Sequence, residues 1–290
     1  MSFVACNLCG ADDYTVRFEA GEAQPARIVE CKQCGLMYSN PRAAEPDHVI
    51  IAAEVRTEAK RGERNTKEEL QVRDYAGTRK ILAERFPKRG RLLDVGNGFG
   101  YLLDYFRKDG WEVAGVDPEE GLNQHAREVL GLDIVTGLLP DANYPDESFD
   151  AVLMMHVIEH VPDPDETLRE IFRVLKPGGM LVMETPRYDT LMMKLFGRRE
   201  RSLSCAGHIY FFTTKTLREV SEKAGFTVVR EDKVGRSLTI GRLVTNVGII
   251  TRSTKLRDAL MKTVRGIGLE NVSMHFNARD MERIYLAKPA

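Results

Sequence analysis

The sequence predicts an α/β fold with a mostly parallel sheet, preceded by a small cysteine-bearing module. Three observations support this fold class. Short apolar runs alternate with helical patterns from residue 91 onward. A glycine-rich turn follows the first of these runs, and two Cys-x-x-Cys pairs stand near the N-terminus. The 290 residues are enough for one large domain or two unequal ones.

Composition argues against several classes of protein. The 42 basic and 43 acidic residues give a formal charge of -1, which does not suit a protein that coats nucleic acid or membrane over its whole surface. No apolar run approaches the roughly 18 to 20 residues that span a bilayer. The first six residues lack the basic and apolar regions of a secretory signal. We therefore expect a cytoplasmic protein.

Four of the five cysteines form two pairs with the same spacing, at residues 6–9 and 31–34, and a glycine follows each pair. This is the pattern of two zinc knuckles, in which the glycine lets the backbone turn through a positive φ. Two disulfides or a redox pair are the alternatives, which a cytosolic chain and the repeated motif disfavour. Because four thiolates close a tetrahedral site, we predict structural Zn²⁺ bound by Cys6, Cys9, Cys31 and Cys34.

The cysteine-bearing segment is acidic, since residues 1–35 carry three basic and five acidic side chains, a net charge of -2. A ribbon that binds nucleic acid should be basic, so a structural or protein-contacting role is favoured. So short a segment buries little core, and the metal would supply folding free energy on the order of 10 kcal/mol. We assign residues 1–40 to a four-cysteine zinc ribbon and residues 41–65 to a linker.

The elements after the linker are predicted from local patterns. A capping box at residues 66–69 opens a helix that ends at residues 87–90, with an apolar stripe of Leu70, Ile81, Leu82 and Phe86. Strands are predicted over residues 91–95, 111–116, 133–135, 149–154 and 180–183. Helices are predicted over residues 101–107, 122–130 and 167–175, the last stopped by Lys-Pro-Gly-Gly. A further helix near Thr214 and a last strand over residues 284–287 complete the alternation, which implies helices on both faces of the sheet.

The first strand ends in a turn over residues 94–100, Asp-Val-Gly-Asn-Gly-Phe-Gly. In a sheet of this kind the ligand lies beyond the carboxyl ends of the strands. A dinucleotide site requires Gly-x-Gly-x-x-Gly, but its third glycine would fall on Tyr101. Asp94 would repel a pyrophosphate, so the turn favours a cationic ligand.

Residues 93–100 resemble motif I of class I S-adenosylmethionine (SAM)-dependent methyltransferases, of the type 11 or ubiquinone-methyltransferase kind. Glu-His-Val-Pro-Asp-Pro at 159–164 and Leu-Lys-Pro-Gly-Gly at 175–179 resemble later landmarks of the same family. The resemblance covers roughly residues 65 to 230. It implies a SAM-binding core over residues 66–235 and a C-terminal substrate or lid region over residues 236–290, which includes the last strand.

The resemblance also assigns roles to individual residues. In this family motif I holds the amino-acid part of SAM, and the acidic residue after the second strand, here Asp117, binds the ribose hydroxyls. Leu138 departs from the pattern, because many members carry an acidic residue near the adenine. Asn97 stands where many members have Cys or Ser. The residues expected to bind SAM are Asp94, Gly96, Asn97, Gly98, Gly100, Asp117, Pro118, Leu138, Leu139 and Met155.

Two histidines, His156 and His208, are candidate general bases for the transfer. On a helix, His156 would share one face with Glu159 and His160. The string over residues 156–160 also matches a zinc-protease pattern, and it resembles a segment linked to Mg²⁺ in ubiquinone-type O-methyltransferases, with fewer carboxylates. The structural alternatives are that Glu159 and His160 fix a loop by hydrogen bonds and that His208 packs or caps a helix.

Basic segments with interleaved apolar residues suggest the kind of acceptor. Residues 187–201 carry a net charge of +3 and residues 230–290 a net charge of +6. We predict transfer to oxygen or carbon of a small-molecule, lipid-like or sugar acceptor, with peripheral membrane contact through the basic C-terminal region. A solvated helix face is the plainer alternative. RNA methylation, which the acidic ribbon disfavours, and a SAM-binding interaction protein without turnover are the rival functions.

Overall fold

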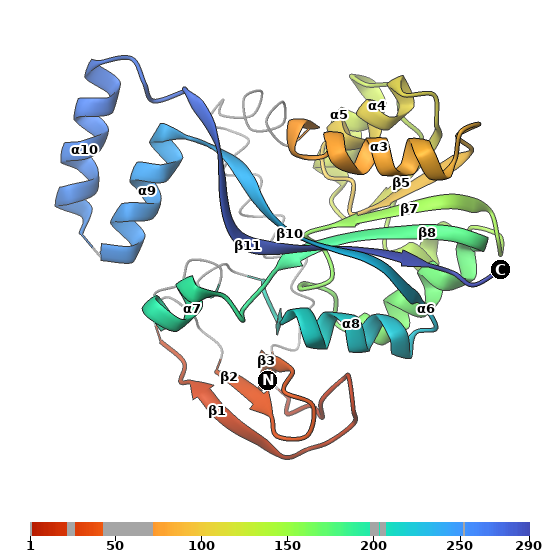
Figure 1. The fold of residues 1–290 in the computed structure, drawn as a ribbon, viewed down its shortest axis with the longest axis horizontal. Coiled ribbons are helices and arrows are strands. Elements are labelled where there is room, and N and C mark those ends of the chain that lie inside the picture. The colour runs from red at the N-terminus through yellow and green to blue at the C-terminus, as the bar shows by residue number, and fades with distance from the viewer. Residues whose placement is uncertain (1, 22–26, 43–71, 198–202, 204–206, 252) are drawn as a thin grey trace.

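The computed structural model describes residues 2–21, 27–42, 72–197, 203, 207–251 and 253–290. A twisted sheet with helices on both faces forms the body, a small second sheet lies against it, and a two-stranded arm carries a pair of helices away from it (Figure 1). The helix start predicted at residues 66–69, and Leu70, lie outside the described residues. None of the described helices is both long and apolar enough to cross a bilayer.

The main sheet has the order β10-β11-β8-β7-β4-β5-β6. Its strands are β4 (Arg91–Val95), β5 (Glu112–Asp117), β6 (Ile134–Thr136), β7 (Phe149–Met155), β8 (Leu175–Pro186), β10 (Thr227–Thr239) and β11 (Ser273–Ala287). The strands from β4 to β8 pair in parallel, whereas β11 runs antiparallel to both β8 and β10. The predicted α/β class, with a mostly parallel sheet and an antiparallel last strand, is confirmed.

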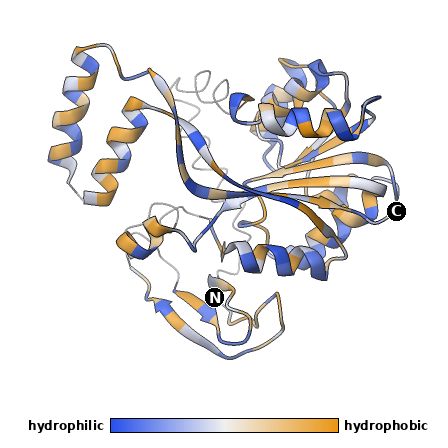
Figure 2. Ribbon diagram, in the orientation of Figure 1, coloured by the Kyte–Doolittle hydropathy of each residue, from blue (hydrophilic) through white to orange (hydrophobic). Residues whose placement is uncertain are grey.

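Helices cover both faces of this sheet because both faces of its inner strands are apolar. The helices are α3 (Ala76–Arg85), α4 (Tyr101–Lys108), α5 (Glu120–Glu128), α6 (Pro164–Val174), α7 (Leu191–Phe196) and α8 (Thr214–Lys223), with a 3-10 turn at Leu139–Ala142. Successive side chains of β4 point to opposite faces: Leu92 joins one core cluster with α3 to α5, and Leu93 joins another with α6 and α8. Hydrophobic residues accordingly follow the central strands (Figure 2).

Several element boundaries differ from the sequence-based expectation. Helix α6 starts at Pro164 rather than 167, because the Asp163 carboxylate accepts a hydrogen bond from the Glu166 amide (3.0 Å) and caps the helix there. The helix ends at Val174, one residue early, and β8 already begins with the Lys-Pro-Gly-Gly segment. The last strand starts at Ser273 instead of 284, since it continues past the sheet as half of the arm.

The second sheet has the order β1-β2-β3-β9 and combines two distant parts of the chain. Its strands are β1 (Tyr14–Phe18), β2 (Ile28–Cys31), β3 (Met37–Ser39) and β9 (Tyr210–Phe211). Tyr38 of β3 pairs with Tyr210 of β9 in an antiparallel ladder. Cys6 and Cys31 share a buried cluster with Ile158 and Phe212 of the body. The cysteine-bearing segment is therefore packed into the main core.

The arm consists of the outer parts of β10 and β11 and the helices α9 (Ile240–Thr251) and α10 (Thr254–Gly266) at its tip (Figure 1). Strand β8 pairs with β11 only from Met281 onward, so residues 273–280 pair with β10 alone or with nothing in the sheet. A bulge at Gly235 bends the ribbon where it leaves the sheet. A Cβ atom at Gly235 would lie 2.2 Å from the Phe276 carbonyl oxygen, so only glycine fits there.

Candidate functional site

The expected cofactor residues meet at one edge of the sheet, beyond the carboxyl ends of β4, β5, β6 and β7. The Gly98 amide donates to the Asp117 carboxylate (3.0 Å), which joins the turn after β4 to the end of β5. A Cβ atom at Gly96 would lie 2.3 Å from the Val157 side chain, so the loop after β7 packs directly on this turn. The segments that the sequence assigned to the cofactor site therefore lie at one edge of the sheet and contact one another.

The turn after β4 exposes backbone at its centre. Gly98 has a φ of +52°, a left-handed conformation that favours glycine, and no atom lies within 4 Å of the position of its missing Cβ. A ligand can therefore approach the Gly98 backbone closely. The neighbouring Asn97 is buried, and its Oδ1 atom has no hydrogen-bond partner among the described residues.

Asp94 is a buried carboxylate for which the described residues supply no side-chain hydrogen bond or ion pair. Burial raises the pKa of Asp94 to about 7, and the nearby Asp117 adds to the rise. An unpaired buried carboxylate is costly unless a positive group comes close to it. The turn is therefore suited to a cationic ligand, as the sequence predicts.

Asp117 ends β5 with both carboxylate oxygens directed into the turn region. One oxygen accepts the Gly98 amide and the other accepts the Glu119 amide (2.8 Å). Burial raises the pKa of Asp117, and these two amide hydrogen bonds partly offset the rise. Each carboxylate oxygen still has a lone pair free for a hydroxyl donor. This arrangement can hold a vicinal diol.

The residues after β5 and β6 form the outer part of this edge. Pro118 is exposed, Leu138 is 45% exposed, and Leu139 is buried in the core. The Asp141 carboxylate accepts the Leu138 amide (2.8 Å), so an acidic group lies three residues beyond the position where this chain departs from the family pattern. Sequence reasoning missed Asp141 because it compared position 138 alone.

A second polar cluster begins where β7 ends, after the half-buried Met155. His156 has a φ of +59°, a left-handed conformation that costs a non-glycine residue roughly 1 kcal/mol or more. Its Nε2 atom lies 3.2 Å from Glu184 Oε1, and its Nδ1 atom lies 3.7 Å from Glu159 Oε1. Residues 156–160 form a turn rather than a helix, so the helical face and the protease-like arrangement do not occur.

The ionisation of His156 follows from these two carboxylates. Burial alone would lower the pKa of His156, but Glu159 and Glu184 outweigh it and raise the pKa to about 9. The same pairing with His156 holds the pKa of Glu159 below its usual range despite burial. At neutral pH the imidazole is protonated and has no lone pair with which to take a proton. Its charge instead compensates two buried carboxylates.

Glu184 and Arg283 complete this cluster and were missed from the sequence. Arg283 Nε donates to Glu184 Oε2 (2.6 Å), and both side chains are almost fully buried. The Arg283 guanidinium also lies over the Tyr75 ring, 4.5 Å from its centroid. A charged residue directly after the apolar run at 180–183, and an arginine beside the last apolar run, were the available signals.

His208 lies close to Glu159 and His160. It is buried, its Nδ1 atom is 3.2 Å from the Tyr188 hydroxyl, and its ring packs edge-on against His160 at 4.6 Å. Glu159, His160 and His208 each offer a ligand atom within 4.8 Å of the others. Burial lowers the pKa of His208 to about 3, so its imidazole is neutral. The two predicted bases thus share one carboxylate but differ in charge.

A profile of the methyltransferase domain family matches residues 66–231, more than half of the chain. The chain belongs to this family. The methyltransferase domain has the α/β Rossmann-like fold of the family, with a mostly parallel central sheet and an antiparallel edge strand. A solved SAM-dependent methyltransferase of Thermotoga maritima, described as a possible histamine N-methyltransferase, is similar over 83% of this chain and 99% of its own, with a TM-score of 0.55 and 20% identity.

Two curated relatives are similar to part of this chain. A probable S-adenosylmethionine-dependent methyltransferase of Mycolicibacterium smegmatis is 35% identical over 155 residues, which cover 53% of this chain and 57% of that protein. A ubiquinone biosynthesis O-methyltransferase of Alkalilimnicola ehrlichii is 37% identical over 103 residues, covering 33% and 41%. The chain thus spans about half the length of the curated relatives that it matches.

The four paired cysteines of the methyltransferase chain converge outside the matched segment. Cys6 Sγ lies 3.4 Å from Cys34 Sγ, Cys9 Sγ lies 3.5 Å from Cys31 Sγ, and all four sulfur atoms lie within 4.8 Å of one another. These contacts are too long for disulfide bonds of about 2.05 Å. They are close to the spacing of about 3.8 Å expected between thiolates around tetrahedral zinc. The donor set fits that ion.

We expect the His156→Gln substitution to destabilise the methyltransferase domain in a pH-dependent way. Because the pKa of folded His156 is raised, its ion pairs contribute fully below the ordinary histidine pKa and are lost as the pH rises through about 9. The melting temperature of the variant should therefore fall below that of the native chain at about pH 6 to 7, and the difference should shrink above about pH 9. Thermal melts of both chains across this range measure it, and a deficit independent of pH would contradict the assigned charge.

Proposed function

We propose that this chain is a SAM-dependent methyltransferase that transfers a methyl group to oxygen or carbon of a small-molecule, lipid-like or sugar acceptor. The observation that carries the proposal is the turn after β4, where Asp94, which has no side-chain partner among the described residues, and the doubly hydrogen-bonded Asp117 flank open backbone at Gly98. A relative named ubiquinone biosynthesis O-methyltransferase supports a small-molecule acceptor. We also propose the division into residues 1–40, 41–65, 66–235 and 236–290, and a cytoplasmic location.

SAM fits the polar groups at this turn. The reacting sulfur of SAM is a positively charged sulfonium, which matches the buried carboxylate of Asp94. Its ribose has two adjacent hydroxyls, which match the free lone pairs of Asp117. The Gly96 to Gly100 backbone would pass beneath the amino-acid part, and Leu138, Leu139, Pro118 and Met155 would border the adenosine. The bound cofactor supplies an already activated methyl group, so the protein has to orient the acceptor and exclude water.

The acceptor side of the proposed site is the cluster around Glu159. Of the two predicted bases, His208 is neutral and retains a lone pair, whereas His156 is held protonated by its carboxylates. We propose that His208 accepts a hydrogen bond from the acceptor and takes its proton only during the methyl transfer, and that His156 acts as a positioning residue for Glu159. Thr185 Oγ1 donates to the other Glu159 oxygen (2.8 Å), which fixes that carboxylate further.

The activity is tested by incubating the full chain with isotopically labelled SAM and fractionated cell extracts, followed by mass spectrometry. We expect the label in a small metabolite or lipid. Label in RNA would support the rival RNA methyltransferase instead. Binding of SAM without any labelled product would support the rival non-catalytic protein. The Asp117→Ala variant serves as the control for labelling that does not depend on the proposed site.

We expect His208→Gln to lower kcat by roughly a hundredfold or more, because the variant lacks the nitrogen that would take the proton of the acceptor. Glutamine keeps a hydrogen-bonding side chain of similar length but takes up no proton near neutral pH. The dissociation constant of SAM should stay unchanged, because His208 lies on the Glu159 side and not at the turn after β4. Steady-state kinetics and calorimetry measure the two quantities, and an unchanged kcat would exclude His208 as a base.

We propose that Cys6, Cys9, Cys31 and Cys34 hold a structural Zn²⁺. The close sulfur cluster and the donor chemistry support this ion. Gly10 and Gly35, with φ of +77° and +80°, follow the two cysteine pairs as zinc knuckles require. Four protein ligands leave no open coordination position, so the metal would act on folding rather than on the transferred methyl group.

A further inference from the structure

The arm carries much of the apolar surface that the described part of the chain exposes. Nine of its sixteen exposed large apolar side chains lie between residues 240 and 276. Helix α10 buries none of its residues, and helix α9 buries only Gly241, Val244 and Gly248. The tip of the arm therefore has little contact with the core that could explain its apolar composition.

The exposed apolar side chains of α10 form one stripe. A helix turns about 100° per residue, so Leu256 and Leu260 lie about 40° apart around the axis, and the exposed Ile267 follows directly after the end of the helix. They are 41%, 37% and 62% exposed. A different side of α10 packs on α9, where Arg257 lies so close to Gly248 that a Cβ atom on that glycine would be 2.7 Å away. The partner helix therefore does not cover the stripe.

Positive charge accompanies this stripe. Residues 240–276 contain six basic and two acidic side chains. Both acidic residues are already paired, Asp258 with Arg257 and Glu270 with Arg265, each at 2.8 Å. Lys255 and Lys262 are exposed and form no salt bridge within the described residues. Seven positions apart, they lie on one side of the helix, about 100° to 160° around the axis from Leu256 and Leu260 and on the side away from Arg257.

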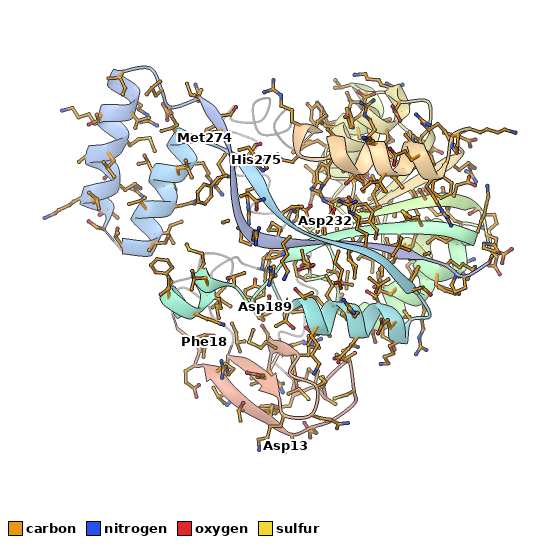
Figure 3. The ribbon with its side chains drawn as sticks, in the orientation of Figure 1. Asp13, Phe18, Asp189, Asp232, Met274 and His275 are labelled. Atoms are coloured by element: carbon orange, nitrogen blue, oxygen red, sulfur yellow. The ribbon has the colours of Figure 1, made fainter. Side chains whose placement is uncertain are left out.

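The arm is held in place where it leaves the body. The Ser237 amide and hydroxyl both donate to the Asp74 carboxylate (2.7 Å each), and His275 Nδ1 lies 3.2 Å from the same group. His275 and Met274 are on the part of β11 that extends beyond the sheet (Figure 3). Arg236 also pairs with Asp280 across the bulge (2.8 Å). These contacts present the helix pair at a fixed distance from the body.

From this placement we propose that α10 and the arm tip form a peripheral docking surface for an anionic lipid bilayer. A helix with an apolar stripe on one side and, on another, exposed lysines that form no salt bridge within the described residues matches a helix that lies in the headgroup region with its apolar side inserted and its lysines directed toward the headgroups. A second copy of the chain fits less well, because a symmetric contact across α10 would bring Lys255 and Lys262 close to the same lysines of the other copy. Acidic lipid headgroups complement this charge.

The docking surface is separate from the proposed methyl-transfer site, but the arm connects the two regions. The arm leaves the sheet through β11, whose inner part carries Arg283 beside the cluster around Glu184. A bilayer bound at the tip would lie on the side of the body from which the arm extends (Figure 1). The docking surface would then keep the chain near an amphiphilic acceptor dissolved in the lipid.

The test is co-sedimentation of the full chain with vesicles of phosphatidylcholine mixed with phosphatidylglycerol, and with phosphatidylcholine alone. We expect binding to the anionic vesicles that weakens with salt, and little binding to the neutral ones. The Leu256→Ser/Leu260→Ser variant should lose binding. The Lys255→Gln/Lys262→Gln variant should lose roughly fivefold for each lysine removed and should respond less to salt.

A matched control is Lys88→Gln/Val129→Ser, which removes one exposed lysine and one exposed apolar residue from the body, after α3 and α5. It should bind vesicles like the native chain. All variants should retain native circular dichroism, because α10 buries nothing. Equal binding of the native chain and the α10 variants would overturn the proposal. So would absence of vesicle binding together with a dimer in light scattering that the α10 variants dissociate, which would identify the surface as a self-association face.

Discussion

Removal of the proposed zinc should disorder the proposed acceptor side of the site while the proposed cofactor side stays intact. Chelation removes the metal, and Cys31→Ser removes one of its four proposed ligands. Binding of the metal is expected to contribute on the order of 10 kcal/mol to the folding of the cysteine-bearing segment. We expect a markedly lower melting temperature, loss of most acceptor turnover, and a SAM dissociation constant within a few fold of the native value. Cys205→Ser, which changes the fifth cysteine outside both motifs, is the matched control and should behave like the native chain.

The expected selectivity follows from what the ribbon contacts. Strand β3 of the ribbon pairs with β9, and the Ile209 and Tyr210 amides at β9 donate to the Glu159 carbonyl at 2.9 and 3.1 Å. Asn7, within the first cysteine pair, donates to the Asp163 side chain (2.9 Å). Both contacts reach the loop after β7. The turn after β4 has no such contact with the ribbon among the described residues.

Hydrogen exchange measured by mass spectrometry distinguishes this outcome from general unfolding. On zinc removal, peptides that cover residues 156–163 and 207–213 should lose protection, whereas the peptides of β4 and β5 should keep it. Uniform loss of protection would show that the ribbon stabilises the whole domain without selectivity. Unchanged protection everywhere would contradict a structural metal at these cysteines.

The strands were predictable because their signal is local. Continuous apolar runs such as residues 151–154 are buried in the sheet. A run of this kind shows the same sequence pattern wherever its strand is placed in the sheet. The cofactor edge was predictable for the same reason, since the turn after β4 keeps its glycines and carboxylate within seven residues. Because these strands are parallel, their carboxyl ends lie together at that edge of the sheet.

Features that depend on distant pairing were not predictable. Strand β9 has two residues, too few for any alternation, and it exists only because β3 offers an edge to it. The pair of Glu184 and Arg283 joins residues 99 positions apart, and each looks like an ordinary surface charge in the sequence. The raised pKa of His156 depends on the carboxylates of Glu159 and Glu184, so the sequence could name the histidine but not its charge.

Asp117→Ala should weaken SAM binding by about a hundredfold or more, the second large effect that we expect. Hydrogen bonds to a charged group contribute roughly 1.5 to 3 kcal/mol each, and a carboxylate that holds both ribose hydroxyls would lose two of them. Asp117→Asn keeps the shape and one acceptor oxygen, so an intermediate loss is expected. Calorimetric titration with SAM gives the dissociation constants directly.

The difficulty with this substitution is that Asp117 also accepts the Gly98 and Glu119 amides, so its removal could disturb the turn itself. Asp150→Asn controls for the loss of a partly buried carboxylate that accepts a backbone amide, since Asp150 accepts the Arg91 amide (2.8 Å) at the opposite end of the parallel strands. That variant should bind SAM normally. A result in which the two variants have the same melting temperature while only Asp117→Asn binds SAM more weakly would assign the weaker binding to the lost contact with SAM and not to a disturbed turn. Native affinity in both Asp117 variants would refute the assignment of the ribose to this carboxylate, because no other described acidic side chain ends β5 at the turn.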